Sequence, residues 1–168
     1  MNTTDTMLLP EDSIIERHRH KHKLLFVCSG NTCRSPMAAA MYNFLYRKSN
    51  ITADSAGIAA DGSPITDFAA YVLAERGVPV TADNNYPAHI SRRVTEEDME
   101  EADAVVAVSA AHATSLVMSF PAYATKITVM ASNIPDPFGG DVADYRECLA
   151  LIEKALVTAF GQPRPQDD

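Results

Sequence analysis

The sequence predicts an α/β fold, a four-stranded parallel sheet with helices on both faces, and two observations lead to it. From Lys23 onward, short apolar runs alternate with longer segments of helical pattern, which is typical of parallel strands connected by helices. The chain has 168 residues with 46% hydrophobic side chains, enough to bury one sizeable core but hardly two. We therefore expect one folded domain over residues 23–161.

Four short apolar runs are the expected strands: Leu24–Cys28, Thr52–Ala56, Ala104–Val108 and Ile127–Met130. Right-handed crossovers between parallel strands put the connecting helices on both faces of the sheet. In such sheets, ligands bind outside the carboxyl ends of the strands. Because Cys28 ends the first expected strand, the loop that follows it lies where a ligand is expected.

Five segments have a helical pattern: Pro36–Lys48, Thr66–Arg76, Glu96–Glu101, Ala110–Phe120 and Val142–Phe160. The first has good start signals, because Ser35 is a favourable N-cap and Pro36 suits the first helical position. The last follows Asp141 and contains Asp144, and negative charge at a helix amino end is favoured by the helix dipole.

The two ends of the chain are expected to be tails. Residues 1–22 lack helical or strand periodicity, and we expect a flexible N-terminal extension there, while residues 162–168 read as a frayed C-terminal tail. Alternating histidines at 18, 20 and 22 can bind a metal, but so short a tail has no surrounding groups to orient them. A solvated tail is therefore the favoured interpretation, and we expect no metal site.

Composition excludes several classes of protein. A net charge of −8 argues against nonspecific binding to nucleic acid or anionic membranes, so any anion site must be built locally. No apolar run approaches the roughly 20 residues that span a membrane, and we expect a soluble, cytoplasmic protein with a monomer as the default. Cys28, Cys33 and Cys148 are odd in number and lack metal-site spacing, which favours free thiols.

The segment from Cys28 to Pro36 reads Cys-Ser-Gly-Asn-Thr-Cys-Arg-Ser-Pro and carries the expected chemistry. Gly30 and Asn31 tolerate left-handed backbone angles, which lets successive amides turn inward as a nest for phosphate oxygens. The helix that starts after the loop directs its positive end toward the same place. Arg34 can close this nest with a planar fork that matches two phosphate oxygens.

A cysteine beside a helix amino end and an arginine loses its proton readily, because the positive potential of both favours the thiolate. Cys28 is then placed for in-line attack on a bound phosphoryl group, which gives a phosphocysteine that water hydrolyses without metal or cofactor. Ser35 can donate a hydrogen bond to the sulfur as it attacks and departs. A cysteine with an arginine six positions later is weak evidence by itself, and the strand before it and the helix start after it favour a phosphate loop over a structural turn.

These residues resemble the signature loop of the low-molecular-weight protein-tyrosine phosphatases, and the similarity extends over most of residues 23–160. The resemblance implies a four-stranded parallel sheet, a phosphocysteine intermediate, a phosphorylated protein as substrate and an aspartate from a distant loop. It also implies phosphate or substrate contacts from the rest of the loop: Ser29, Gly30, Asn31, Thr32, Cys33 and Ser35.

Asp136 is the expected general acid. It lies in Ile134-Pro-Asp-Pro-Phe-Gly-Gly, a turn-rich stretch after the last expected strand, on the same rim as the loop after the first strand. An Asp-Pro pair alone is most often a turn, and the proton-donor role comes from the resemblance to the family's Asp-Pro loop. By the same resemblance, His89 supports Asn31 through hydrogen bonds and Phe138 lines the pocket rim. Taken alone, His89 is an ordinary histidine.

Two positions bear on the phosphoamino acid. Thr32 stands where tyrosine-specific members commonly have isoleucine, and Phe138 with Gly139 replaces a pair of tyrosines, which resembles the bacterial protein-arginine-phosphatase branch. A threonine hydroxyl can hydrogen-bond a polar group, whereas isoleucine suits a phenyl ring. The sequence therefore favours phosphoarginine and leaves phosphotyrosine open as the alternative.

Three other functions fit the residues less well. A thioredoxin-coupled arsenate reductase needs relay cysteines, and only Cys148 lies outside the loop. A catalytically silent phosphate-binding module is disfavoured because nucleophile, clamp and acid are all present. A nucleotide-binding P-loop is excluded because the chain lacks the Gly-Lys-Ser or Gly-Lys-Thr element.

Cys33 has two interpretations. It is a small loop residue or, as the family makes plausible, a partner that forms a disulfide with Cys28 on oxidation.

Overall fold

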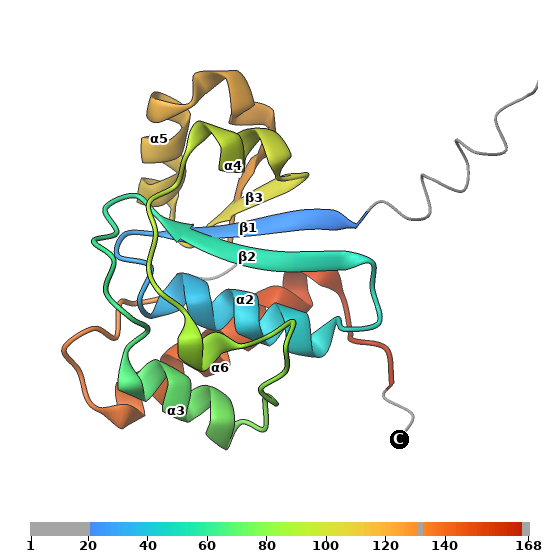
Figure 1. The fold of residues 1–168 in the computed structure, drawn as a ribbon, viewed down its shortest axis with the longest axis vertical. Coiled ribbons are helices and arrows are strands. Elements are labelled where there is room, and N and C mark those ends of the chain that lie inside the picture. The colour runs from blue at the N-terminus through green and yellow to red at the C-terminus, as the bar shows by residue number, and fades with distance from the viewer. Residues whose placement is uncertain (1–20, 131–132, 166–168) are drawn as a thin grey trace, which may run out of the picture.

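The computed structural model describes residues 21–130 and 133–165. The elements in chain order are β1 (His22–Cys28), α2 (Arg34–Leu45), β2 (Ile51–Gly57), α3 (Asp67–Glu75), η1 (Tyr86–Ala88), α4 (Glu96–Glu101), β3 (Ala104–Ala107), α5 (Ala110–Ser119), η2 (Pro121–Lys126), β4 (Ile127–Val129) and α6 (Val142–Phe160) (Figure 1). The predicted N-terminal extension lies outside the described residues except for Lys21 and His22, and His22 already belongs to β1. Of the predicted C-terminal tail, residues 166–168 lie outside as well.

The four strands form one parallel sheet in the order β2-β1-β3-β4, which confirms the predicted fold. After β1 the chain crosses to β2 on one side, and after β3 it crosses to β4 on the other side. The loops that leave β1 and β3 therefore diverge from adjacent strands at the carboxyl edge. That is the point at which open α/β sheets bind ligands.

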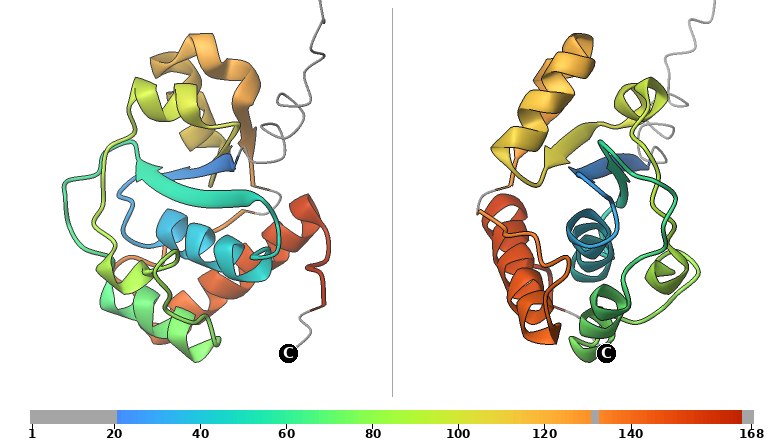
Figure 2. Two further views of the ribbon diagram at one scale, coloured as in Figure 1. Left: turned by 45° about the vertical axis from the view of Figure 1, so that its right-hand side comes forward. Right: turned by 90° about the vertical axis from the view of Figure 1, so that its left-hand side faces the viewer.

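Helices cover both faces of the sheet, with α2, α3 and α6 on one face and α4 and α5 on the other (Figures 1 and 2). Successive strand residues point to opposite faces, so β1 contributes to two cores. Phe26 packs in the larger core, which contains residues of α2, α3 and α6, and Val27 packs in the smaller one with Met99 of α4 and Leu116 of α5. No helix of the described residues is both long and apolar enough to cross a bilayer.

Most predicted boundaries agree with the structure, and the start of α2 is the informative exception. The helix begins at Arg34, and its N-cap is Cys33, which makes no side-chain capping bond. Ser35 was predicted as the N-cap and Pro36 as the first helical residue, but both lie inside the first turn. The Ser35 hydroxyl is engaged with Cys28 and Asn31 instead. Sequence reasoning also missed η1 and η2, which are 3₁₀ helices and so lack the 3.6-residue periodicity by which an α-helix is predicted.

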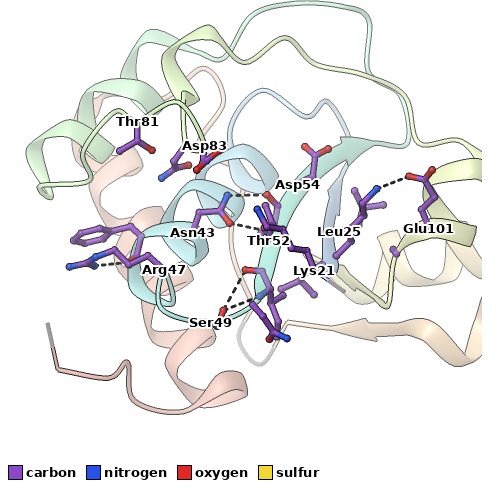
Figure 3. A pocket seen from close by; sticks show the side chains of 18 of the residues that line it. Lys21, Leu25, Asn43, Arg47, Ser49, Thr52, Asp54, Thr81, Asp83 and Glu101 are labelled. Carbon is purple, nitrogen blue, oxygen red and sulfur yellow. Dashed lines mark hydrogen bonds and ion pairs between the residues drawn. The ribbon is translucent and has the colours of Figure 1, made fainter. Parts of the chain in front are cut away.

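The outer edge of β2 is closed to further strand pairing by side chains. The Asn43 amide bonds both the N–H and the C=O of Ala53, at 2.8 and 2.9 Å, and the Ser49 hydroxyl bonds both backbone groups of Ile51. A groove of about 840 Å³ runs along this edge (Figure 3). It is lined by the amino-terminal halves of β1 and β2, whereas Cys28 lies at the carboxyl end of β1, so the groove is separate from the predicted site.

Candidate active site

The Cys28–Arg34 loop turns its backbone amides inward because its carbonyl groups are bonded outward. The carbonyl oxygens of Cys28, Ser29 and Thr32 accept hydrogen bonds of 2.9 to 3.1 Å from amides outside the loop, those of Ile58, Ala59 and Thr66 in that order. Of the amides from Ser29 to Cys33, only that of Asn31 donates within the described part of the chain, to the Cys28 sulfur at 3.3 Å. The loop is thus a concave set of donors that fits a tetrahedral oxyanion.

Asn31 fixes the shape of this loop. Among the described residues it is the only non-glycine with positive φ, at 58°, whereas Gly30, which was also predicted to use left-handed angles, does not. Its side chain is fully buried, and its amide nitrogen donates to the hydroxyls of Ser35 and Ser55 at 2.8 and 3.0 Å. Its amide oxygen accepts from the backbone of Arg92 at 3.0 Å. These bonds offset the cost of the left-handed backbone, which is of order 1 to 3 kcal/mol.

The Cys28 sulfur lies at the bottom of the nest, 2.9 Å from the Ser35 hydroxyl oxygen. That oxygen already accepts a hydrogen bond from the side-chain amide of Asn31. Its own proton is therefore free to point at the sulfur, which is much closer than its other acceptor, the Ala56 carbonyl at 3.5 Å. The sulfur thus receives hydrogen bonds from the Ser35 hydroxyl and from the Asn31 amide.

Arg34 and Asp136 meet at the mouth of the loop although they are far apart in sequence. Arg34 Nη2 lies 3.6 Å from Asp136 Oδ2, and Arg34 Nη1 donates to the carbonyl of Ile134 at 3.4 Å. The Arg34 side chain is 11% exposed and that of Asp136 is 53% exposed, so the carboxylate faces the open side. Asp136 Oδ1 accepts from the amide of Phe138 at 3.1 Å, which fixes the turn and leaves the Phe138 ring exposed.

Thr32 and Cys33 form the wall on the α3 and α6 side. The only side-chain hydrogen bond of Thr32 in the described residues is a 3.7 Å contact with the Cys33 sulfur. Cys33 is buried, with its sulfur 3.4 Å from the Tyr145 hydroxyl and 3.5 Å from the Thr66 hydroxyl. Burial raises the pKa of Tyr145 to about 12, and the hydrogen bond with Cys33 contributes. Burial likewise raises the pKa of Cys148, under the same loop, to about 12.

Two histidines hold the loop from outside, and the sequence pointed to one of them. His89 Nε2 donates to the Asn31 carbonyl at 2.9 Å. His112, which sequence reasoning missed, lies in α5 with Nε2 2.8 Å from the Ser29 hydroxyl and Nδ1 2.9 Å from that of Ser109. The available signal was its place in the first helical turn after β3, at the edge of the sheet that also carries Cys28.

Comparisons with known proteins agree with this geometry. A family model described as low molecular weight phosphotyrosine protein phosphatase matches residues 23–162. The protein-arginine-phosphatase of Geobacillus stearothermophilus is 36% identical over 145 residues, which cover 80% of this chain and 91% of the relative. That of Bacillus subtilis is 32% identical over 143 residues, 79% of this chain and 91% of the relative. The solved low molecular weight protein tyrosine phosphatase from T. tengcongensis matches with a TM-score of 0.74 at 30% identity, covering 82% of this chain and 97% of that one.

Proposed function

The chain belongs to the low-molecular-weight phosphotyrosine protein phosphatase family and is a phosphatase, and from this premise we propose that it hydrolyses phosphoarginine in proteins through a phosphocysteine on Cys28. The observation that carries the chemistry is the sulfur at the bottom of a nest of inward-facing amides, hydrogen-bonded by Ser35 at 2.9 Å. This arrangement holds the phosphoryl group next to the sulfur atom that attacks it.

The first half of the proposed reaction transfers the phosphoryl group to sulfur. The loop amides and Arg34 bind the three non-bridging oxygens, and the Cys28 thiolate attacks phosphorus in line with the leaving group. As the S–P bond forms, the P–N bond breaks and its electron pair stays on the guanidine nitrogen. Asp136 in its acid form gives that nitrogen a proton.

The second half returns the enzyme to its starting state. The Asp136 carboxylate removes a proton from a water molecule that attacks the phosphocysteine, which restores the acid form of Asp136. The S–P bond breaks, its electron pair returns to sulfur, and inorganic phosphate leaves. The Ser35 hydrogen bond stabilises the thiolate as it departs.

Two features support phosphoarginine. Within the described part of the chain, the Thr32 hydroxyl has only a long contact to sulfur, at 3.7 Å, so it is available to a guanidinium N–H of the substrate. Asp136 is half-exposed at the mouth, where its carboxyl group can hydrogen-bond a nitrogen of the same guanidinium group before proton transfer. The relatives from Bacillus and Geobacillus are named protein-arginine-phosphatases.

Phosphotyrosine is the second candidate, and the structural likeness to the tyrosine phosphatase from T. tengcongensis favours it. Phe138, whose ring is 69% exposed beside Asp136, offers an apolar contact to a phenyl ring.

The test is the ratio of kcat/KM on two peptides of one sequence, one carrying phosphoarginine and the other phosphotyrosine, with Cys28→Ser as the blank. We expect the ratio to favour phosphoarginine and Thr32→Ile to shift it toward phosphotyrosine by about tenfold, the value of one lost hydrogen bond to a charged group. Thr52→Ile, on the exposed face of β2, is the matched control. An unchanged ratio in Thr32→Ile refutes the role of Thr32, and turnover of neither peptide refutes the proposed function.

A further inference from the structure

The Ser29–His112 contact joins the two loops that diverge at the centre of the sheet. Ser29 directly follows Cys28 at the end of β1, and His112 lies in the first turn of α5, after the neighbouring strand β3. The contact is 2.8 Å long, and His112 is only 7% exposed, so water competes little for the imidazole. Ser29 itself, the residue next to the nucleophile, is exposed.

We infer that His112 is a positioning residue: its Nδ1 accepts a hydrogen bond from Ser109 and its Nε2–H donates one to Ser29, so that the Ser29 hydroxyl becomes a donor to the bound phosphoryl group. The inference rests on the proposed function, because it requires a phosphoryl group in the Cys28 loop. It adds a side-chain donor to the backbone amides and Arg34.

The neutral form of the His112 imidazole is favoured, and in that form only one of the two ring nitrogens carries a proton. Burial lowers the pKa of His112, and the positive charge of Arg34 lowers it further, against an opposing effect of Asp136. A neutral imidazole has one donor and one acceptor nitrogen. The tautomer therefore determines whether each neighbouring hydroxyl donates or accepts the hydrogen bond with the ring.

Two proton arrangements satisfy the observed distances. In one, Ser109 donates to Nδ1 and Nε2–H donates to Ser29, which leaves the Ser29 proton for another acceptor. In the other, Nδ1–H donates to Ser109 and Ser29 donates to Nε2, which turns a Ser29 lone pair outward. Ser109 can serve in both, since its oxygen already accepts from the His112 amide at 3.3 Å and has a further lone pair.

A phosphoryl anion in the nest selects the first arrangement. An outward O–H on Ser29 attracts the anion, whereas an outward lone pair repels it. The Ser29 carbonyl accepts a hydrogen bond from the Ala59 amide at 2.9 Å, and the Ser29 hydroxyl is held by His112. Because both groups are held, the hydroxyl needs little reorganisation when the anion binds. His112 therefore acts on the substrate only through Ser29.

The test is a double-mutant cycle on the inhibition constant of inorganic phosphate, with hydrolysis of an aryl phosphate as the assay. We expect Ser29→Ala and His112→Leu each to weaken phosphate binding about tenfold, and the double variant to be no weaker than either single one. In His112→Gln the side-chain amide replaces Nε2–H as donor, and we expect binding within about threefold of the parent.

A purely structural role for His112 predicts a different result. Loss of packing would weaken binding in the Ser29→Ala background as well, and Gln would not rescue it, so additive effects overturn the inference. The tautomer is read independently by long-range proton–nitrogen NMR of His112 with inorganic phosphate bound: Nε2–H supports the inference and Nδ1–H overturns it. A parent protein that neither binds phosphate nor hydrolyses either phosphopeptide overturns the proposed function too.

Discussion

Gly57→Ala tests whether the shape of the Cys28 loop is set by its contact with the end of β2. A Cβ at Gly57 would lie 2.6 Å from the Ser29 carbonyl oxygen, 2.9 Å from Asn31 Cβ and 3.1 Å from Ala60 Cβ. Gly57 cannot retreat, because hydrogen bonds of 2.8 and 2.9 Å tie its backbone to residues 92 and 94. An ordinary contact starts at 3.4 Å, so the Ser29 oxygen has to move by about 0.8 Å.

A shift of that size moves the Gly30 amide, which shares a planar peptide unit with the Ser29 carbonyl, and it disturbs the Ser29 hydroxyl. Overpacking costs about 1 to 3 kcal/mol of stability, and a misplacement near 1 Å at a reacting centre costs about 100-fold in rate. We expect Gly57→Ala to lower kcat/KM on an aryl phosphate by about 100-fold while the protein remains folded in urea titrations.

The matched control is Leu156→Ala in α6, a fully buried side chain outside the loop. It is expected to lose about 2 to 5 kcal/mol of stability, at least as much as Gly57→Ala, and to keep kcat/KM per folded molecule. A Gly57→Ala enzyme with kcat/KM within a few-fold of the parent would show that the loop does not depend on this close approach.

Three further predictions follow from individual contacts. Arg34→Lys keeps the positive charge but loses the planar fork, and we expect kcat/KM to fall by at least about 100-fold; a loss below tenfold would mean that charge alone suffices. Asp141 is the N-cap of α6 and accepts from an amide three residues on at 3.1 Å. Asp141→Ala should lower the urea-derived stability by about 1 kcal/mol, whereas Asp141→Asn, which can still cap, should retain most of it. The pKa values of Cys148 and Tyr145 are raised from 9.0 and 10.0 to about 12, so the unfolded chain loses these protons at lower pH than the folded one. Stability should therefore be unaffected at neutral pH and fall between about pH 9 and 12, and Cys148→Ala should flatten that fall; an unchanged slope would contradict the role of its burial.

Much of the fold could be predicted because its signals are local. The strand that ends at Cys28 follows from a short apolar run, and α6 was predicted with its observed bounds, since a long periodic pattern preceded by Asp141 marks its start. The boundary of α2 could not be predicted, because Ser35 is a good N-cap by residue type and only the tertiary structure shows its hydroxyl bonded to the Cys28 sulfur.

The same division holds for the site. Local sequence patterns were enough to place Cys28 and Arg34 around one loop between a strand and a helix, with Asp136 on the same rim. The contact of Ser29 with His112, which lies 83 residues further along the chain, is visible only in the folded protein. Backbone preferences act between near neighbours, whereas the hydrogen bonds that orient these side chains form only when packed strands bring distant residues together.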